Sequence, residues 1–288
     1  MKKAGAISLV LFLLLEVSNA FAIKQYTISE LKQNPKFNIS ISATGGYSEK
    51  SIELKVKSDY KRDVEMLIPT GTVFYTSDES HQILIVVEEQ LLVIQKGRLK
   101  KKSLDGFCTE ASDGVPSSEM AMEFMPTKRE KLQKLADYLN SNKDFDSHEI
   151  QEAVWCVSDN HSVSNIYAST PKKSKQLQTF VAKLTGQKIT WNSVKRNHRI
   201  VNGYIETEPV FVTGKIVFST ESTTKVKSKI IDDEGNDVYL NPDQMTLPKT
   251  DGAELEFGLT VNGWESGTYY VVYYDQNDKT ILKKEFKL

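Results

Sequence analysis

The order of apolar and polar residues divides the chain into three regions with different periods. In the first, residues 23–116, the apolar side chains of Ile52, Leu54 and Val56 alternate with charged ones. Such alternation is typical of a strand with one face in a core and one in solvent. Turn residues separate further short apolar runs, as in a β-sandwich. We expect strands at residues 52–56, 64–68, 72–76, 82–88 and 91–95.

The second region, residues 117–187, has the period of an α-helix. Three helices are predicted, each with apolar residues at positions i, i+3, i+4 and i+7. Because each has one apolar stripe, we expect them to pack on one another or on the preceding sheet. The signals are the stripes beginning at Leu132, Ile150 and Leu177, the capping boxes Thr127–Glu130 and Asp146–Glu149, and the helix ends Thr170-Pro171 and Gly186.

The third region returns to the period of a strand. Residues 188–202 are polar and basic and are predicted to be a linker, in which Trp191 docks against a neighbouring part. After them come about seven short strands, a number that fits an immunoglobulin-like sandwich. They are expected at residues 210–212, 214–219, 225–231, 237–240, 254–261, 267–274 and 280–286.

The predicted fold class is therefore an α+β multidomain protein. Its parts are an N-terminal β-sandwich (23–116), a three-helix segment packed on it (117–187), a linker (188–202) and a C-terminal Ig-like β-sandwich (203–288).

Residues 1–22 have the three parts of a secretory signal peptide. Lys2 and Lys3 are positive, an apolar run too short to span a bilayer follows, and Ala20-Phe21-Ala22 has the small-x-small pattern of a cleavage site. We expect cleavage after Ala22 and a secreted, periplasmic or cell-surface location. Later apolar runs have the length of strands, so no transmembrane segment is expected after the signal is removed.

Composition narrows the class of partner. With 37 basic and 38 acidic residues the formal net charge is −1, which argues against a nucleic-acid partner. The hydrophobic content of 39% argues against disorder.

No motif of a known catalytic or cofactor site is found in the chain. The four histidines are scattered and lack the spacing of metal ligands, so no catalytic residue, cofactor or metal is predicted. These histidines are His81, His148, His161 and His198.

Three further clusters have both a structural and a functional interpretation. The acidic residues of 232–237 favour a hairpin turn over a Ca²⁺ site, because their spacing is not that of an EF-hand. The basic run 96–102 favours a solvated edge strand over a surface for anionic glycans or lipids. One pair among Tyr269, Tyr270, Tyr273 and Tyr274 is expected in the core, and the other is a candidate binding surface.

Two resemblances extend this interpretation. Residues 231–238, Ser266-Gly267-Thr268-Tyr269-Tyr270-Val271 and the terminal segment 283–288 resemble the Ig-like C-terminal modules of exported Bacteroidota proteins, including sorting domains of type IX secretion. The segment lacks their Pro-Asn-Pro-type opening. Residues 150–155, Ile-Gln-Glu-Ala-Val-Trp, resemble the Gln-x-Ala-x-Trp helix of bacterial surface thioester domains. That resemblance implies a bond between the side chains of Gln151 and an upstream cysteine, here Cys108, although residues 106–109 depart from the family's cysteine motif.

The two cysteines leave three alternatives open. Cys108 and Cys156 in an exported chain favour a disulfide. Cys156 beside an apolar stripe also fits a buried free thiol. A Cys108–Gln151 thioester is the third, and it excludes the disulfide because Gln151 and Cys156 point in different directions on one helix.

We therefore expect an exported, non-enzymatic binding or structural protein that acts through its surfaces, toward another protein or a glycan. The alternatives are a covalent thioester adhesin and an enzyme with a dispersed site.

Overall fold

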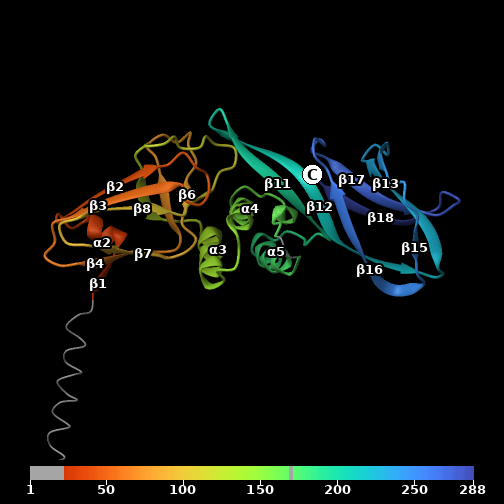
Figure 1. The fold of residues 1–288 in the computed structure, drawn as a ribbon, viewed down its shortest axis with the longest axis horizontal. Helices are drawn as coiled ribbons and strands as arrows, with labels where there is room; N and C mark the ends of the chain where they lie inside the picture. Colours follow the sequence, from red (N-terminus) through yellow and green to blue (C-terminus); the bar gives the residue numbers. More distant parts are fainter. Residues whose placement is uncertain (1–22, 169–170) are drawn as a thin grey trace, which may run out of the picture.

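The computed structural model describes residues 23–168 and 171–288. The predicted signal peptide (1–22) and the predicted helix start at Thr170 lie outside the described residues. Figure 1 shows an elongated molecule in which N-terminal sheets, a group of helices and a C-terminal pair of sheets follow one another along the long axis. Within residues 23–168 and 171–288, no helix is long and apolar enough to cross a membrane.

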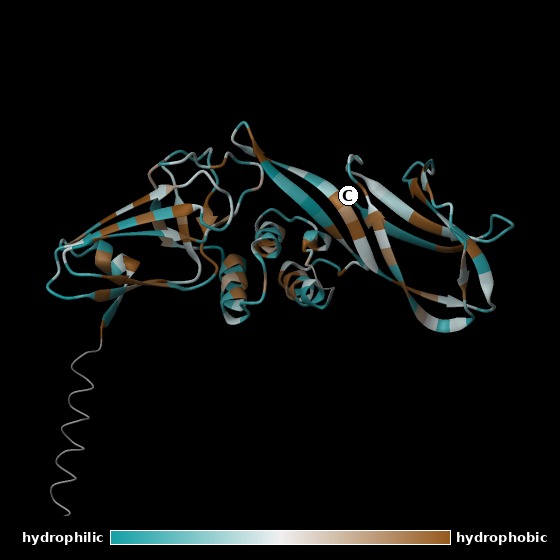
Figure 2. Cartoon of the chain, viewed as in Figure 1, coloured by the Kyte–Doolittle hydropathy of each residue, from teal (hydrophilic) through white to brown (hydrophobic). Residues whose placement is uncertain are grey.

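Two three-stranded sheets enclose the N-terminal core, in the orders β1-β4-β7 and β2-β3-β8. Ile52, Leu54 and Val56 on β3 are fully buried, as their alternation predicts. Figure 2 shows this alternation as brown and teal bands along the strands. The elements are β1 (Lys24–Thr27), the short helix α2 (Ile28–Lys32), β2 (Phe37–Ala43), β3 (Ile52–Ser58), β4 (Val64–Ile68), β7 (Gln90–Ile94) and β8 (Leu99–Leu104).

A third sheet has four strands in the order β10-β5-β6-β9; β5, β6 and β9 are largely buried on both faces, whereas β10 is partly exposed. Successive residues of a strand point to opposite faces. Cys108 therefore lies in the N-terminal core, whereas Phe107 lies in a second core shared with the helices. This sheet joins the N-terminal sheets to the helices. Its strands are β5 (Thr72–Tyr75), β6 (Leu84–Ile85), β9 (Phe107–Cys108) and β10 (Glu123–Pro126), so the strand expected at residues 82–88 is much shorter than predicted.

The three predicted helices are present, together with the 3-10 helix η1 (Val163–Asn165): α3 (Glu130–Ser141), α4 (Ser147–Ser158) and α5 (Pro171–Thr185). Their apolar stripes form the second core. The Asp146–Glu149 capping box of α4 is confirmed. The Thr127–Glu130 box is wrong, because α3 has Arg129 at its N-cap with no side-chain cap. Gly186, at a φ of +85°, follows α5 as predicted.

The C-terminal part is a sandwich of two sheets around one core. One sheet has the order β11-β12-β16; the other has the order β14-β13-β17-β18, with β15 paired to β13. The strands are β11 (Asn192–Val201), β12 (Tyr204–Thr220), β13 (Thr224–Asp232), β14 (Asp237–Leu240), β15 (Met245–Leu247), β16 (Thr250–Thr260), β17 (Thr268–Tyr274) and β18 (Thr280–Lys287).

The predicted linker at 188–202 is wrong for most of its length. Residues 192–201 form β11, which pairs with β12 in a long antiparallel hairpin. The strands expected at 210–212 and 214–219 are parts of the single strand β12. A Cβ atom on Gly214 would lie 2.5 Å from the backbone oxygen of Trp191, so the close approach of these strands needs glycine. Trp191 docks as expected, with its indole N–H donating to the backbone oxygen of Glu285.

The turn of this hairpin reaches back to the N-terminal part. The backbone N–H of Val115 donates to the backbone oxygen of Gly203 at 2.7 Å. In Figure 1 the β11–β12 hairpin runs from the C-terminal sandwich past α4 toward the N-terminal loops. We call it the β11–β12 arm. The fold is thus α+β with several packed sheets, in agreement with the predicted fold class.

Candidate functional site

One face of helix α4 carries the candidate site. Gln151 and Glu152 lie three and four residues after His148, and Trp155 lies four and three residues after them, which places all four on the same side of a helix. The opposite side packs against α3 and α5 through Ala153 and neighbouring residues. The helix is therefore buried on two sides.

The side chain of Gln151 binds the backbone of Cys108 through both of its polar atoms. Its Oε1 accepts from the Cys108 N–H at 3.1 Å, and its Nε2 donates to the Cys108 oxygen at 2.9 Å. The same N–H also donates to the Tyr47 oxygen at 2.9 Å. Both residues are buried, with exposed fractions of 1% for Gln151 and 0% for Cys108. The pair implied by the resemblance to thioester domains is thus in contact.

No disulfide joins Cys108 and Cys156, and both side chains are buried. The physical reason is that Cys108 faces the N-terminal core whereas Cys156 faces the helical core. The Cys156 thiol donates to the Ser162 backbone oxygen at 3.3 Å. Burial raises the pKa of each thiol well above its usual value, so both remain protonated at neutral pH.

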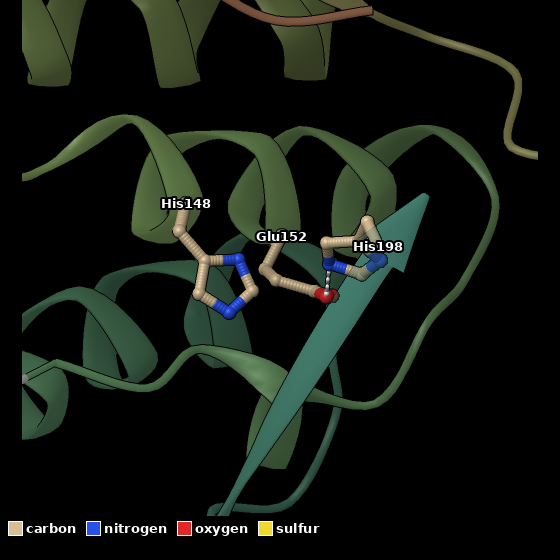
Figure 3. Close-up of side chains that lie close together, drawn as sticks. All are labelled: His148, Glu152 and His198. Carbon is tan, nitrogen blue, oxygen red and sulfur yellow. Dashed lines mark ion pairs between the residues drawn. The ribbon is translucent and has the colours of Figure 1, made fainter. Parts of the chain in front are cut away.

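Three side chains converge next to this face of α4, as Figure 3 shows. His148 and Glu152 come from α4, and His198 comes from β11. The His198 Nε2 lies 2.9 Å from a carboxylate oxygen of Glu152, and the rings of His148 and His198 are 5.1 Å apart. Burial lowers the pKa of His148, although the charge of Glu152 acts in the opposite direction. We call these three residues the His–Glu–His cluster.

Trp155 covers one side of this cluster. Its ring is 5.2 Å from that of His198 and stacks on Tyr47 at 6.2 Å. The side chain is 1% exposed and lies in the N-terminal core, as expected of a residue that joins two parts of the molecule. Its indole N–H has no hydrogen-bond partner among the described residues.

An open cavity of about 560 Å³ lies beside this face of α4. Its walls come from α4, from both strands of the β11–β12 arm and from the loop at Tyr47. Gln151, His148 and His198 line it, together with basic residues such as Arg196 and acidic ones such as Glu206. The cavity therefore gives solvent a route toward the Gln151 side chain and two of the three clustered groups.

The other clusters have structural surroundings. Tyr269 and Tyr273 lie in the C-terminal core, so they do not belong to a binding surface. Tyr270 and Tyr274 are half-buried beneath lysine ammonium groups, at 4.0 Å from Lys283 for Tyr270. This leaves at most two of the four tyrosines for the predicted surface.

The acidic segment and the basic run also have the structures expected of them. The acidic segment contains the turn between β13 and β14, held by a bond from the Asn236 N–H to the Asp232 carboxylate. Lys100, Lys101 and Lys102 of the basic run are exposed on β8, an edge strand of its sheet. Both agree with the structural interpretations.

The His–Glu–His cluster was not predicted from the sequence. The available signal was the i, i+4 spacing of His148 and Glu152 on a predicted helix, which brings both to one face. His198 gave no signal, because it lies in residues 188–202, for which the sequence predicts a linker.

No protein-family model matches this chain, and no curated protein matches it. Among solved structures, the chain is similar to the transglutaminase of red sea bream, with 6% identity and a TM-score of 0.19 over 89% of this chain and 31% of that chain. It is also similar to a β-glucosidase from Kluyveromyces marxianus, with 12% identity and a TM-score of 0.20 over 82% of this chain and 44% of that chain. The chain spans less than half the length of either enzyme, and similarity at these TM-scores carries no argument about function.

Proposed function

We propose that this chain is an exported binding protein that attaches covalently to a protein or glycan partner through a thioester between Cys108 and Gln151. The observation that carries the proposal is the paired hydrogen bonds between the Gln151 amide and the Cys108 backbone. These residues are 43 positions apart, and the sequence resemblance had paired them independently.

In this proposal the thioester forms at the Gln151 amide carbon. The Cys108 sulfur attacks this carbon, the carbon–nitrogen bond breaks, and the thiol proton leaves with the nitrogen as ammonia. The Cys108 N–H, already 3.1 Å from Oε1, stabilises the negative charge that develops on that oxygen. The nitrogen that leaves is held by the Cys108 oxygen at 2.9 Å.

Transfer to a partner is the second step. An amine or hydroxyl of the partner reaches the thioester carbonyl through the cavity that Gln151 lines. The new bond forms to the Gln151 carbon while the carbon–sulfur bond breaks. The buried Cys108 site disfavours a thiolate, so the sulfur takes the proton that the attacking group gives up. The event happens once per chain, in keeping with a non-enzymatic protein.

The competing interpretation is that the Gln151 side chain only provides hydrogen bonds to the backbone groups of Cys108 at the edge of strand β9. A buried backbone group without a partner is costly, and a glutamine amide satisfies both backbone groups of Cys108 at once. In that case the protein binds its partner without a covalent bond, and the cavity is an ordinary binding surface. The two interpretations differ in the mass of the chain and in the number of free thiols.

The test is the intact mass of the full exported chain, purified without reductant or amine buffers. A thioester lowers the mass by one ammonia molecule and leaves one free thiol in the denatured protein instead of two. Methylamine should then add to the chain and release the second thiol. C108A and Q151A should each abolish the mass deficit, whereas C156A, the matched control, should keep it. A full-mass chain with two free thiols would refute the proposal and favour non-covalent binding.

A further inference from the structure

Glu152 is a buried carboxylate without hydrogen bonds. Its side chain is 1% exposed, and neither oxygen has a hydrogen-bond partner among the described residues. His198 Nε2 lies 2.9 Å from one oxygen, but the angles are not those of a hydrogen bond, and this nitrogen also has no partner. Burying a carboxylate costs several kcal/mol unless a cation or donors compensate it. The site therefore needs a positive charge close to this group.

No permanent cation of the described residues pairs with Glu152. Arg196 lies on the same strand as His198, but its guanidinium binds the Asn165 side chain at 3.1 Å. Burial lowers the pKa of Arg196, and the nearby charge of Glu152 acts in the opposite direction. Among the described residues, however, the two side chains do not form a salt bridge. Arg196 thus offsets only part of the cost of burying the carboxylate.

The three side chains of the cluster offer donor atoms in a small volume. One ligand atom each from His148, Glu152 and His198 lies within 4.8 Å of the others. The His148 Nε2 is also buried without a partner among the described residues. In Figure 3 the Glu152 carboxylate lies between the two imidazole rings. Two imidazoles and one carboxylate form a donor set typical of Zn²⁺ and of other first-row divalent ions, with further positions left open.

A neighbour of His198 orients its ring for this role. His198 Nδ1 lies 2.9 Å from the Thr207 hydroxyl on the paired strand β12. When Nδ1 carries the proton and donates to this hydroxyl, Nε2 presents its lone pair toward Glu152. Metal-binding histidines are commonly oriented by a hydrogen bond of this kind at the other ring nitrogen.

We propose that His148, Glu152 and His198 bind a divalent transition-metal ion, for which Zn²⁺ is the best-fitting candidate. The ion takes one nitrogen from each imidazole and an oxygen from the carboxylate, and its remaining positions are available to water or to a donor group of a partner. The proposal does not depend on the thioester, since none of its ligands is Cys108 or Gln151.

The test is Zn²⁺ binding by the full chain after metal has been removed with a chelator. We expect one Zn²⁺ per chain in a competition titration with a chromogenic chelator, and a rise in the melting temperature of the wild type on adding Zn²⁺. E152Q and H198Q should each weaken Zn²⁺ binding at least ~100-fold. Loss of a residue that only hydrogen-bonds to a metal ligand already lowers metal affinity ~10–100-fold, and these variants remove a ligand itself. H161Q is the matched control, because His161 also lies against Trp155 but is not in the cluster.

Co²⁺ substitution gives a second readout. Its visible absorption bands depend on nitrogen and oxygen ligands at the site, so they should be present in the wild type and H161Q and absent in E152Q. Each variant is compared by its metal-free unfolding curve, which identifies any that fails to fold. Absence of Zn²⁺ binding by the wild type would overturn the proposal, as would folded E152Q and H198Q that bind as tightly as the wild type. Intact mass reports on the thioester separately, so failure of either proposal can be told from failure of the other.

Discussion

Two capping boxes in this protein have the same hydrogen bonds in opposite surroundings. In α2 the Glu30 carboxylate is exposed, and bonds from Thr27 lower its pKa. In α4 the Glu149 carboxylate is 2% exposed, and one oxygen has no partner among the described residues. Burial is the main cause that raises the pKa of Glu149, to about 7. We predict that Glu149 makes the protein less stable as the pH rises.

The direction and size follow from proton linkage. Between the ordinary pKa of 4.5 and the folded value of about 7, the folded protein keeps a proton that the unfolded chain releases. The free energy of unfolding therefore falls as the pH rises through that window, and the loss of stability is complete above pH 7. At ~1.4 kcal/mol per pKa unit the upper limit is ~3 kcal/mol, and ~1 kcal/mol is expected after allowing for water near the group.

Urea unfolding at about pH 5 and about pH 8 measures this loss, because it gives the free energy of unfolding at each pH. E149Q keeps an amide oxygen for the capping box but cannot ionise, so it should lose ~1 kcal/mol less than the wild type between these values. E30Q is the matched control; it should lose as much as the wild type, because Glu30 is already ionised at both values. Equal pH dependence in E149Q and the wild type would refute the reasoning.

Two further predictions concern the β11–β12 arm. G214A should lower the free energy of unfolding of the sandwich, measured with denaturant, by about 1–3 kcal/mol, because the added Cβ meets the Trp191 backbone. G252A is the control: its added Cβ meets nothing within 4 Å, so the change should be less than about 0.5 kcal/mol. A fragment of residues 188–288 should melt cooperatively, whereas one of residues 203–288 should melt lower or aggregate, because it lacks β11 and exposes a strand edge. Equal melting of the two fragments would mean that β11 adds nothing to the sandwich.

The local pattern of apolar and polar residues was sufficient to predict a helix or strand wherever one side of that element is apolar and the other is polar. Strand β3 and the stripe of α4 follow directly from apolar spacing. The Thr127–Glu130 box failed because a capping box is a local signal, and the helix begins after Arg129 instead. A short motif can fix a helix end only within a few residues.

Strand β11 shows why the candidate site itself escaped prediction. Its inward positions include Val194, but further along they include Arg196 and His198, so the period of two is present without apolar residues to reveal it. A strand whose inward side chains are polar is not detected from the hydropathy pattern of the sequence. Such inward polar side chains are most frequent at functional sites. Position along the chain also gave no indication that β11 would come to lie against α4.

The β11–β12 arm gives the molecule a mechanical property. Its strands run obliquely from the C-terminal sandwich toward the N-terminal loops in Figure 1, and β12 continues into the sandwich, where it pairs with β16. A pull on the tip of the arm away from the sandwich acts along β12 and loads its hydrogen bonds to β16 together, in shear. Zipper-like opening would break them one by one at lower force. The arm is thus suited to carry load from the N-terminal loops that its tip contacts to the far end of the protein.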